Sequence, residues 1–185
     1  MAHDPVIGLG YVRKSRPSLN DPVRFMCKEC GRCCAVFYIN VTDADVIRIA
    51  KETDRSPQDF VDLCPSKSII GQDEDCNLKM QTGTYRIILV EGGGRCIFQL
   101  DDRRCGIYES RPLPCRIFPF DIKDGKVVLN RDAIGVCKSL SSKGHPIDED
   151  NISLLRGQLS LEVGQFIERI QEWNSLFDRG EVDGT

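Results

Sequence analysis

The residues of this sequence best suited to chemistry are its cysteines, which number ten in 185 residues. Four of them fall in one short run, Cys27-Lys28-Glu29-Cys30-Gly31-Arg32-Cys33-Cys34. Each Cys-x-x-Cys step directs two thiolates to one centre, and two successive steps resemble the first part of a bacterial ferredoxin run, although the closing x3-Cys-Pro is absent. The run therefore predicts a metal site, and unrelated buried cysteines are the less favoured interpretation. In an extended backbone the adjacent Cys33 and Cys34 side chains would diverge.

The other cysteines are dispersed, and their spacing alone identifies no site: Cys64, Cys76, Cys96, Cys105, Cys115 and Cys137. Only His3 and His145 are present, so any metal site must be mainly thiolate. Disulfides are the alternative use of ten cysteines. They are disfavoured because the first 26 residues contain no apolar signal core, which predicts a reducing, cytoplasmic location.

The composition is that of an ordinary globular chain, with 41 % hydrophobic and 29 % charged residues. The net charge of −3 gives no strong nucleic-acid signal, because general nucleic-acid binding rests on a basic surface. The longest aliphatic runs, such as 87–90, are too short for a membrane span. We therefore expect no membrane segment and a core of the size that one domain can bury.

The first half of the chain predicts short elements. Residues 35–39 are apolar and aromatic and favour a strand. Thr42-x-x-Asp45 is a capping-box pattern that predicts a helix. Its expected buried face consists of Val46, Ile47, Ile49 and Ala50. Ser56-Pro57 repeats the start signal and predicts a second short helix to about Leu63.

Two hairpins are expected after these helices. Residues 84–90 favour a strand, with 96–100 as its partner across Gly92-Gly93-Gly94. Residues 121–129 favour a second hairpin, because Asp124-Gly125 is a strong two-residue turn signal.

The C-terminal stretch predicts one long amphipathic helix. Its apolar residues recur at steps of three and four: Ile152, Leu155, Leu159, Val163, Phe166, Ile170, Trp173 and Phe177. We expect this stripe to pack on the protein's own core, with a protein partner as the alternative. The predicted fold is thus a small α+β, cysteine-rich, metal-centred domain. It divides into an irregular arm (1–24), a cysteine-cluster domain (25–140) and the helix (148–178).

The order of the motifs identifies a family resemblance. The chain has Cys-x2-Cys-Gly-x-Cys-Cys, then Cys-x-Phe, then Cys-x-Ile-Tyr-x-x-Arg-Pro-x-x-Cys-Arg-x-Phe-Pro, over roughly residues 25–137. This pattern resembles the YkgJ-type cysteine-cluster family, which is described as a zinc- or iron-chelating domain. The resemblance implies these metal ligands: Cys27, Cys30, Cys33, Cys34, Cys96, Cys105, Cys115 and Cys137. Cys64 and Cys76 lie outside the motif.

Eight thiolates suit either an iron–sulfur cluster or zinc, and the sequence does not choose between them. We slightly favour a [4Fe–4S] cluster because the crowded first run resembles cluster ligation. Arg111 and Arg116 flank Cys115, and Tyr108 lies nearby, so these three are the expected cofactor-binding residues. The guanidinium groups would offset thiolate charge or hold a substrate carboxylate; a structural salt bridge at the Arg-Pro turn is equally favoured.

The expected function is that of a metal-binding protein with a redox role, and no catalytic residue is assigned. One alternative is protein-lysine methylation, because flagellin lysine N-methylases contain a similar domain; S-adenosylmethionine would be the cofactor only in that case. The glycine run at 92–94 stands in the wrong context for its binding motif. A second alternative is a structural zinc module that presents the C-terminal helix to a partner.

Overall fold

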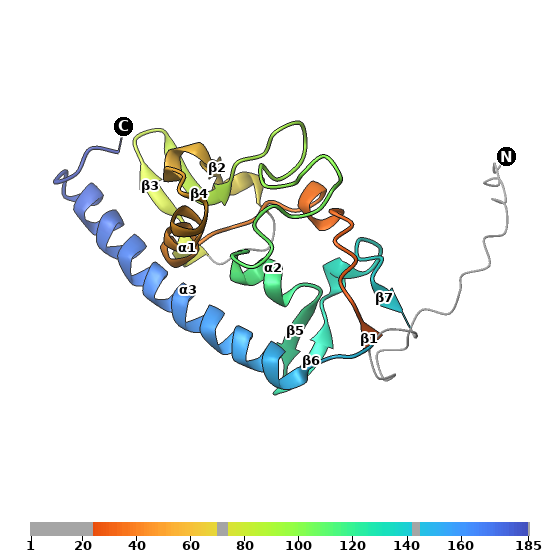
Figure 1. Cartoon of the computed structure of the whole chain (residues 1–185). Coiled ribbons are helices and arrows are strands. Elements are labelled where there is room, and N and C mark those ends of the chain that lie inside the picture. The colour runs from red at the N-terminus through yellow and green to blue at the C-terminus, as the bar shows by residue number, and fades with distance from the viewer. Residues whose placement is uncertain (1–23, 70–73, 142–144, 185) are drawn as a thin grey trace, which may run out of the picture.

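The computed structural model describes residues 24–69, 74–141 and 145–184. The arm predicted for residues 1–24 lies outside this part except for Arg24. A long helix, α3 (Glu149–Asp178), runs along one side of the molecule. In Figure 1 a small sheet packs near its C-terminal half, while α2 (Leu113–Ile117) and a hairpin lie near its N-terminal half. The predicted α+β fold is confirmed.

Helix α3 begins at a side-chain cap and buries the predicted stripe. The Asp148 carboxylate accepts a hydrogen bond of 2.9 Å from the Asn151 amide. The fully buried members of the stripe are Ile152, Leu155, Leu159, Phe166 and Ile170. Leu155 and Leu159 pack with Leu113 and Ile117 of α2. The stripe therefore faces the protein's own core, as the sequence favoured.

Helix α1 (Asp43–Thr53) forms where the capping box predicted it. The Thr42 hydroxyl accepts from the Asp45 amide, and the Asp45 carboxylate accepts from the Thr42 amide, each at 3.2 Å. Ile49 is fully buried, but Ile47 is 65 % exposed, so its assignment to the buried face was wrong. Residues two apart on a helix point in widely different directions, which explains the difference.

The main sheet has the order β2-β4-β3, formed by β2 (Val61–Pro65), β4 (Gly83–Leu89) and β3 (Leu78–Met80). The strand predicted at 84–90 is confirmed, but its predicted partner at 96–100 is wrong. Strand β4 pairs with β2 and β3 instead. A local hairpin with β3, connected by Gln81-Thr82, and the more distant β2 take the two edges of β4; of the predicted hairpin only an antiparallel bridge between Glu91 and Cys96 forms.

Two other predictions for the first half are wrong. The segment predicted as a second helix forms one 3-10 turn, Pro57–Asp59, before β2 begins at Val61. The segment predicted as a strand at 35–39 follows a 3-10 turn, Cys33–Ala35, and only Asn40 bridges to Ile88. Further single 3-10 turns comprise Ser66–Ser68, Glu74–Cys76 and Arg131–Ala133.

The hairpin predicted at 121–129 is confirmed as β5 (Phe120–Lys123) and β6 (Lys126–Leu129). Both tip residues have positive φ, 51° at Asp124 and 72° at Gly125. That combination is required by a type I′ turn, for which Asp-Gly is a preferred sequence.

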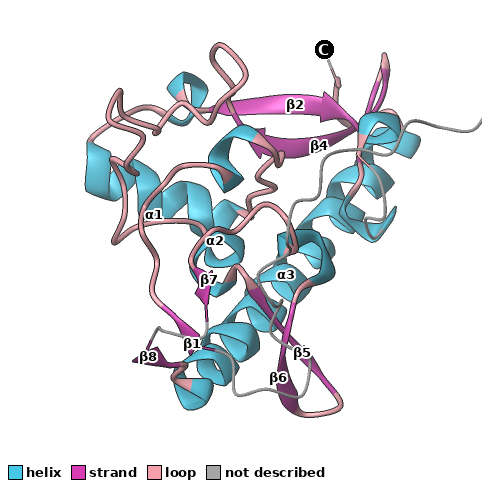
Figure 2. Ribbon diagram, turned by 90° about the vertical axis from the view of Figure 1, so that its right-hand side faces the viewer, coloured by secondary structure: helices cyan, strands magenta, loops and turns pink. Residues whose placement is uncertain are grey.

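A third small sheet joins the beginning and the end of the cysteine region. Strand β1 (Arg24–Phe25) pairs antiparallel with β7 (Leu140–Ser141) and β8 (His145–Pro146). Figure 2 shows these three short strands together, apart from the β2-β4 pair. The sheet brings the chain before Cys27 next to the chain after Cys137.

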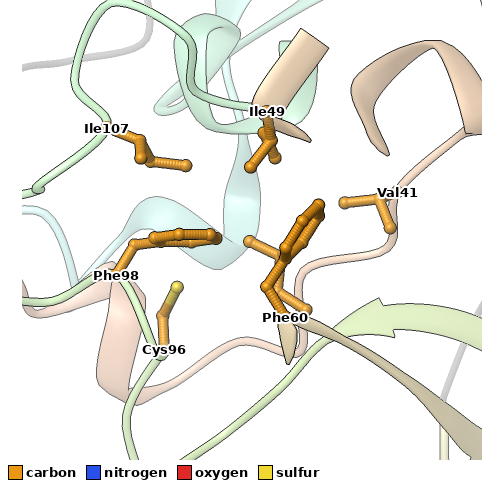
Figure 3. Packing of buried hydrophobic residues seen from close by; sticks show 7 residues of the cluster. Val41, Ile49, Phe60, Cys96, Phe98 and Ile107 are labelled. Atoms are coloured by element: carbon orange, nitrogen blue, oxygen red, sulfur yellow. The ribbon is translucent and has the colours of Figure 1, made fainter. Parts of the chain in front are cut away.

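The main apolar cluster lies between α1 and the main sheet and contains a thiol. Its buried members are Val41, Ile49, Phe60, Leu89, Cys96, Phe98 and Ile107. Figure 3 shows Cys96 close to Phe98 within this cluster. Cys34 and Cys105 pack against its edge. The core and the cysteine region are therefore continuous.

Candidate metal centre

One cavity of about 570 Å³ collects nearly all of the cysteines. The thiol-bearing residues that line it are Cys27, Cys30, Cys33, Cys34, Cys76, Cys96, Cys105, Cys115 and Cys137. They include all eight cysteines that the resemblance implied, together with Cys76. Cys64 lies on β2 outside this lining and is buried. The two cysteines outside the motif therefore differ, since only Cys76 reaches the cavity.

The first cysteine run is held by a glycine and a glutamine. Gly31 has a φ of +66°, a conformation that glycine adopts without strain. Its carbonyl accepts a 2.9 Å hydrogen bond from Gln99 Nε2, which also donates to the Arg103 carbonyl at 3.3 Å. The Cys96 amide donates to the Cys34 carbonyl at 2.9 Å. These bonds fix Cys34 beside Cys96 although 61 residues separate them in sequence.

Two further cysteines approach from neighbouring segments. Cys105 forms an isolated bridge with Gln99, so the Cys96 and Cys105 segments lie side by side. Cys115 lies in the short helix α2, and its amide donates to the Pro112 carbonyl at 2.9 Å. The Pro residues at 112 and 114 suit the first turn of a helix, because their fixed φ fits and no amide is lost.

Four of these thiols lie close enough together that the negative charge of one raises the pKa of its neighbours. Burial raises the pKa of the Cys115 thiol well above its ordinary value, and the neighbouring Cys33, Cys96 and Cys105 raise it further. Burial likewise raises the pKa of Cys96 and of Cys105, with Cys33 contributing to both. Loss of their protons would therefore bring several negative charges together, which a cation would relieve.

The pKa of the Cys33 thiol is raised chiefly by its neighbour in the sequence. A hydrogen bond with the Cys34 side chain is the largest cause of the raised pKa of Cys33; burial adds to it. The 3-10 turn brings these neighbouring thiols together. The divergence considered from the sequence applies to an extended backbone, which these two residues do not have.

The other three family thiols, Cys27, Cys30 and Cys137, lie near the β1–β7 pairing. The Lys28 amide donates to the Ser139 hydroxyl at 3.0 Å, which joins the Cys27–Cys30 loop to the Cys137 segment. Burial raises the pKa of the Cys137 thiol, and the charges of Cys27 and Cys30 raise it further. The Cys27 sulfur also accepts a hydrogen bond of 3.4 Å from the Glu29 amide.

Tyr108 and Arg111 stack at the wall of the cavity. The Arg111 guanidinium carbon lies 3.5 Å from the centre of the Tyr108 ring, and Arg111 Nε donates to the Tyr108 carbonyl at 2.6 Å. Burial raises the pKa of Tyr108; Arg111 lowers it, whereas the charge of Cys27 and a hydrogen bond to its side chain raise it. Arg111 also lowers the pKa of Cys105 and Cys115. Its positive charge therefore acts on one thiol from the loop before α2 and on one thiol of α2 itself. Arg116 lines the same cavity.

Aromatic rings cover the thiols. Phe118 meets Phe37 edge to face at 5.5 Å, and Phe120 meets Phe25 in the same manner at 5.2 Å. All four rings line the cavity. Low local polarity strengthens the interaction between thiolate and cation.

The donor set fits a soft metal or an iron–sulfur cluster, because thiols dominate and all ten are free. Within residues 24–69, 74–141 and 145–184, no three Cys, His, Asp or Glu side chains are already spaced to hold an ion. Closing a centre would therefore require thiol side chains to rotate. The same ranges contain no helix long and apolar enough to cross a membrane.

The fold and the site thus define a small α+β protein built around a thiol-lined cavity. The chain belongs to the CxxCxxCC family, whose model matches residues 26–138 and is described as a zinc- or iron-chelating domain. Comparisons with curated proteins and with solved structures found no match.

Several residues that shape the site were not singled out for that role in the sequence. Gln99 and Ser139 hold the two ends of the first cysteine run, and Asp45 accepts from the Leu113 amide at 3.1 Å. The capping-box pattern identified Asp45 only as a helix cap. Nothing local marks these contacts, because each joins segments at least 68 residues apart.

Proposed function

We propose that the cavity thiols hold a [4Fe–4S] cluster and that the protein transfers electrons. The observation that carries this proposal is the convergence of all eight family cysteines, without histidine, on one cavity. Thiolates are the usual ligands of such clusters. When bound, the cluster would supply reversible one-electron chemistry.

The protein's own residues would support this role in three ways. The paired rings of Phe37 and Phe118 give the cavity an apolar wall. Arg111 places positive charge near Cys105 and Cys115, which favours their thiolates. The charge of Cys27 raises the pKa of Tyr108, which places the Tyr108 hydroxyl near that thiol. Charge and hydrogen bonds at the sulfurs are established means of adjusting a cluster potential.

The test is anaerobic purification followed by ultraviolet–visible spectroscopy and analysis of iron, sulfide and zinc. We expect a brown protein with broad visible absorption that bleaches on reduction, and comparable amounts of iron and sulfide. A colourless protein that contains zinc would overturn the cluster and support the structural zinc alternative. A protein with neither metal above background would overturn metal binding altogether.

The methyltransferase alternative stays a prediction and gains no support from the glycine run. Residues 91–112 contain turns and isolated bridges but no helix, and the Gly92 amide donates to the Arg95 carbonyl at 2.9 Å. This geometry closes a turn and opens no helix for a phosphate or a nucleoside. Incubation with a labelled methyl donor and candidate proteins tests this alternative directly.

A protein partner for the C-terminal helix also stays a prediction. The stripe of α3 expected to bind it is buried on the protein's own core. Leu154 and Leu161 are 71 % and 62 % exposed on another side of the helix, so any partner would meet that side.

A further inference from the structure

We propose that seven of the eight family cysteines form two centres that bind metal separately. The inner group comprises Cys33, Cys96, Cys105 and Cys115. The outer group comprises Cys27, Cys30 and Cys137. This division rests on the proposed metal-binding function and deepens it, because it states which thiols share a metal.

The outer group is defined by the pairing of β1 with β7. Their antiparallel register places Arg24 opposite Ser141 and Phe25 opposite Leu140. The 3.0 Å hydrogen bond from the Lys28 amide to Ser139 shows that the two segments do remain together. Cys27 and Cys30 flank Lys28, and Cys137 precedes Ser139 by two residues, so the three thiols lie on adjoining segments and line the same cavity.

The inner group is defined by contacts around Gln99. The Cys96 amide binds the Cys34 carbonyl, and Gln99 bridges to Cys105. Cys33 precedes Cys34 directly. The Gly106 amide donates to the Phe98 carbonyl at 2.8 Å, which extends the contact between the Cys96 and Cys105 segments. Helix α2 adds Cys115 from the other side, where the Asp45 carboxylate fixes its first turn.

Gly31 separates the two groups in the sequence. It lies between Cys30 and Cys33, has a φ of +66°, and its carbonyl is bound by Gln99 of the inner region. The chain turns at Gly31 as it does at Glu29, whose φ is 48°, but the Gly31 turn is the one that Gln99 holds to the inner region. Without this turn, successive Cys-x-x-Cys steps would direct three thiols to one centre.

The two groups also differ in exposure. Cys96 is 8 % exposed and belongs to the apolar core, whereas Cys27 is exposed to solvent. The outer group has three thiols, and such a centre leaves a ligand position for water or another small molecule. Metal should therefore leave the outer centre faster than the inner one when a chelator is added. Cys34, whose carbonyl accepts from the Cys96 amide, stays beside the inner centre.

The test compares metal release from the full chain as purified anaerobically. Iron and zinc per chain are measured first, and release to a coloured chelator is then followed over time. We expect two phases in the wild-type protein. Cys30→Ser should lose the fast phase and keep the slow one, whereas Cys105→Ser should lose the slow phase. Cys64→Ser, outside the cavity, serves as the matched control and should keep both.

If Cys105→Ser does not fold, Cys30→Ser alone decides the question. A wild-type protein that is loaded but releases its metal in one phase would overturn the division and leave the proposed function standing. So would a Cys30→Ser protein that loses both phases or neither. A wild-type protein without metal would instead overturn the proposed function itself.

Discussion

The Asp45 carboxylate accepts a hydrogen bond from the Leu113 amide at 3.1 Å, which joins the first turn of α1 to the first residue of α2. The same carboxylate caps α1 and pairs with Arg48 at 2.6 Å, and Arg48 pairs with Glu162 of α3 at 3.0 Å. Three helices therefore meet through one buried carboxylate. Cys115 lies two residues beyond Leu113, so its position depends on this network.

Replacing Asp45 should therefore weaken both the fold and the metal site. The Asp45 side chain is 1 % exposed, so Asp45→Ala removes a buried partner of Arg48 together with the helix cap. We expect a decrease of about 3 kcal/mol in the free energy of unfolding, measured by urea denaturation, and a lower metal content.

Asp43→Ala is the matched control for this change. Asp43 also lies in the first turn of α1 and pairs with an arginine, Arg169, at 2.7 Å, but both side chains are largely exposed. An exposed pair contributes less than about 1 kcal/mol. Equal losses in the two variants would contradict the role given to Asp45.

A methyl group at Gly31 should damage the first cysteine loop. A Cβ there would collide with the Gln99 amide and lie 2.5 Å from the Arg103 carbonyl oxygen. Backbone strain at positive φ and this collision should both lower the free energy of unfolding of Gly31→Ala. The collision should contribute about 2 kcal/mol beyond the strain, and the variant should bind less metal.

Gly93→Ala isolates the effect of backbone strain. Gly93 has a φ of +63°, but a methyl group added there would meet no atom within 4 Å, so only the strain of about 1 kcal/mol applies. Urea denaturation and metal analysis of both variants make the comparison. If Gly93→Ala were as harmful as Gly31→Ala, the contact with Gln99 would not explain the effect.

The parts of the fold that were predictable are those encoded locally. The cap at Thr42, the turn at Asp124-Gly125 and the stripe of α3 each depend on residues near one another in sequence. The failures involve competition between distant segments. Residues 61–65 pair with β4 because β4 offers a strand edge, and that pairing excludes the helix expected there.

The candidate site also has a part that the sequence predicts and a part that depends on contacts between distant segments. The family motif supplied eight cysteines that the structure brings to one cavity. The motif gave no sign that Cys76 joins them while Cys64 does not, because that difference follows from the path of the main sheet. Nor could it show the hydrogen bond from Gln99 to Gly31, whose partners are 68 residues apart.

The edge strand β3 should depend on one asparagine of α3. Asn174 accepts from the Lys79 amide at 2.7 Å and donates to the Asn77 carbonyl at 2.8 Å, so it occupies backbone groups of an edge strand. Asn174→Ala should lower the free energy of unfolding by about 2 kcal/mol, because two hydrogen bonds are lost. Urea denaturation measures the change, and faster hydrogen exchange at Lys79 would locate it.

The control for this variant is Gln171→Ala, an exposed change on the same helix that should stay within about 0.5 kcal/mol of the wild type. The rate of metal release should be unchanged in both variants, since neither residue lines the cavity. Slower or faster release in Asn174→Ala would contradict the separation of this contact from the thiols.

Metal binding should release protons, and its affinity should rise with pH. The pKa values of Cys96, Cys105 and Cys115 are raised above the ordinary 9.0 chiefly by burial, so these thiols are protonated near pH 7 without metal. A metal binds the thiolate and must displace each proton. For every proton displaced, affinity for zinc should increase roughly tenfold per pH unit between pH 6 and 8.

Titration of the metal-free full chain with zinc, with a pH indicator in weak buffer, counts the protons. Cys64→Ser should release the wild-type number, whereas Cys105→Ser should release fewer; binding that is independent of pH would show that the coordinating groups are not these thiols.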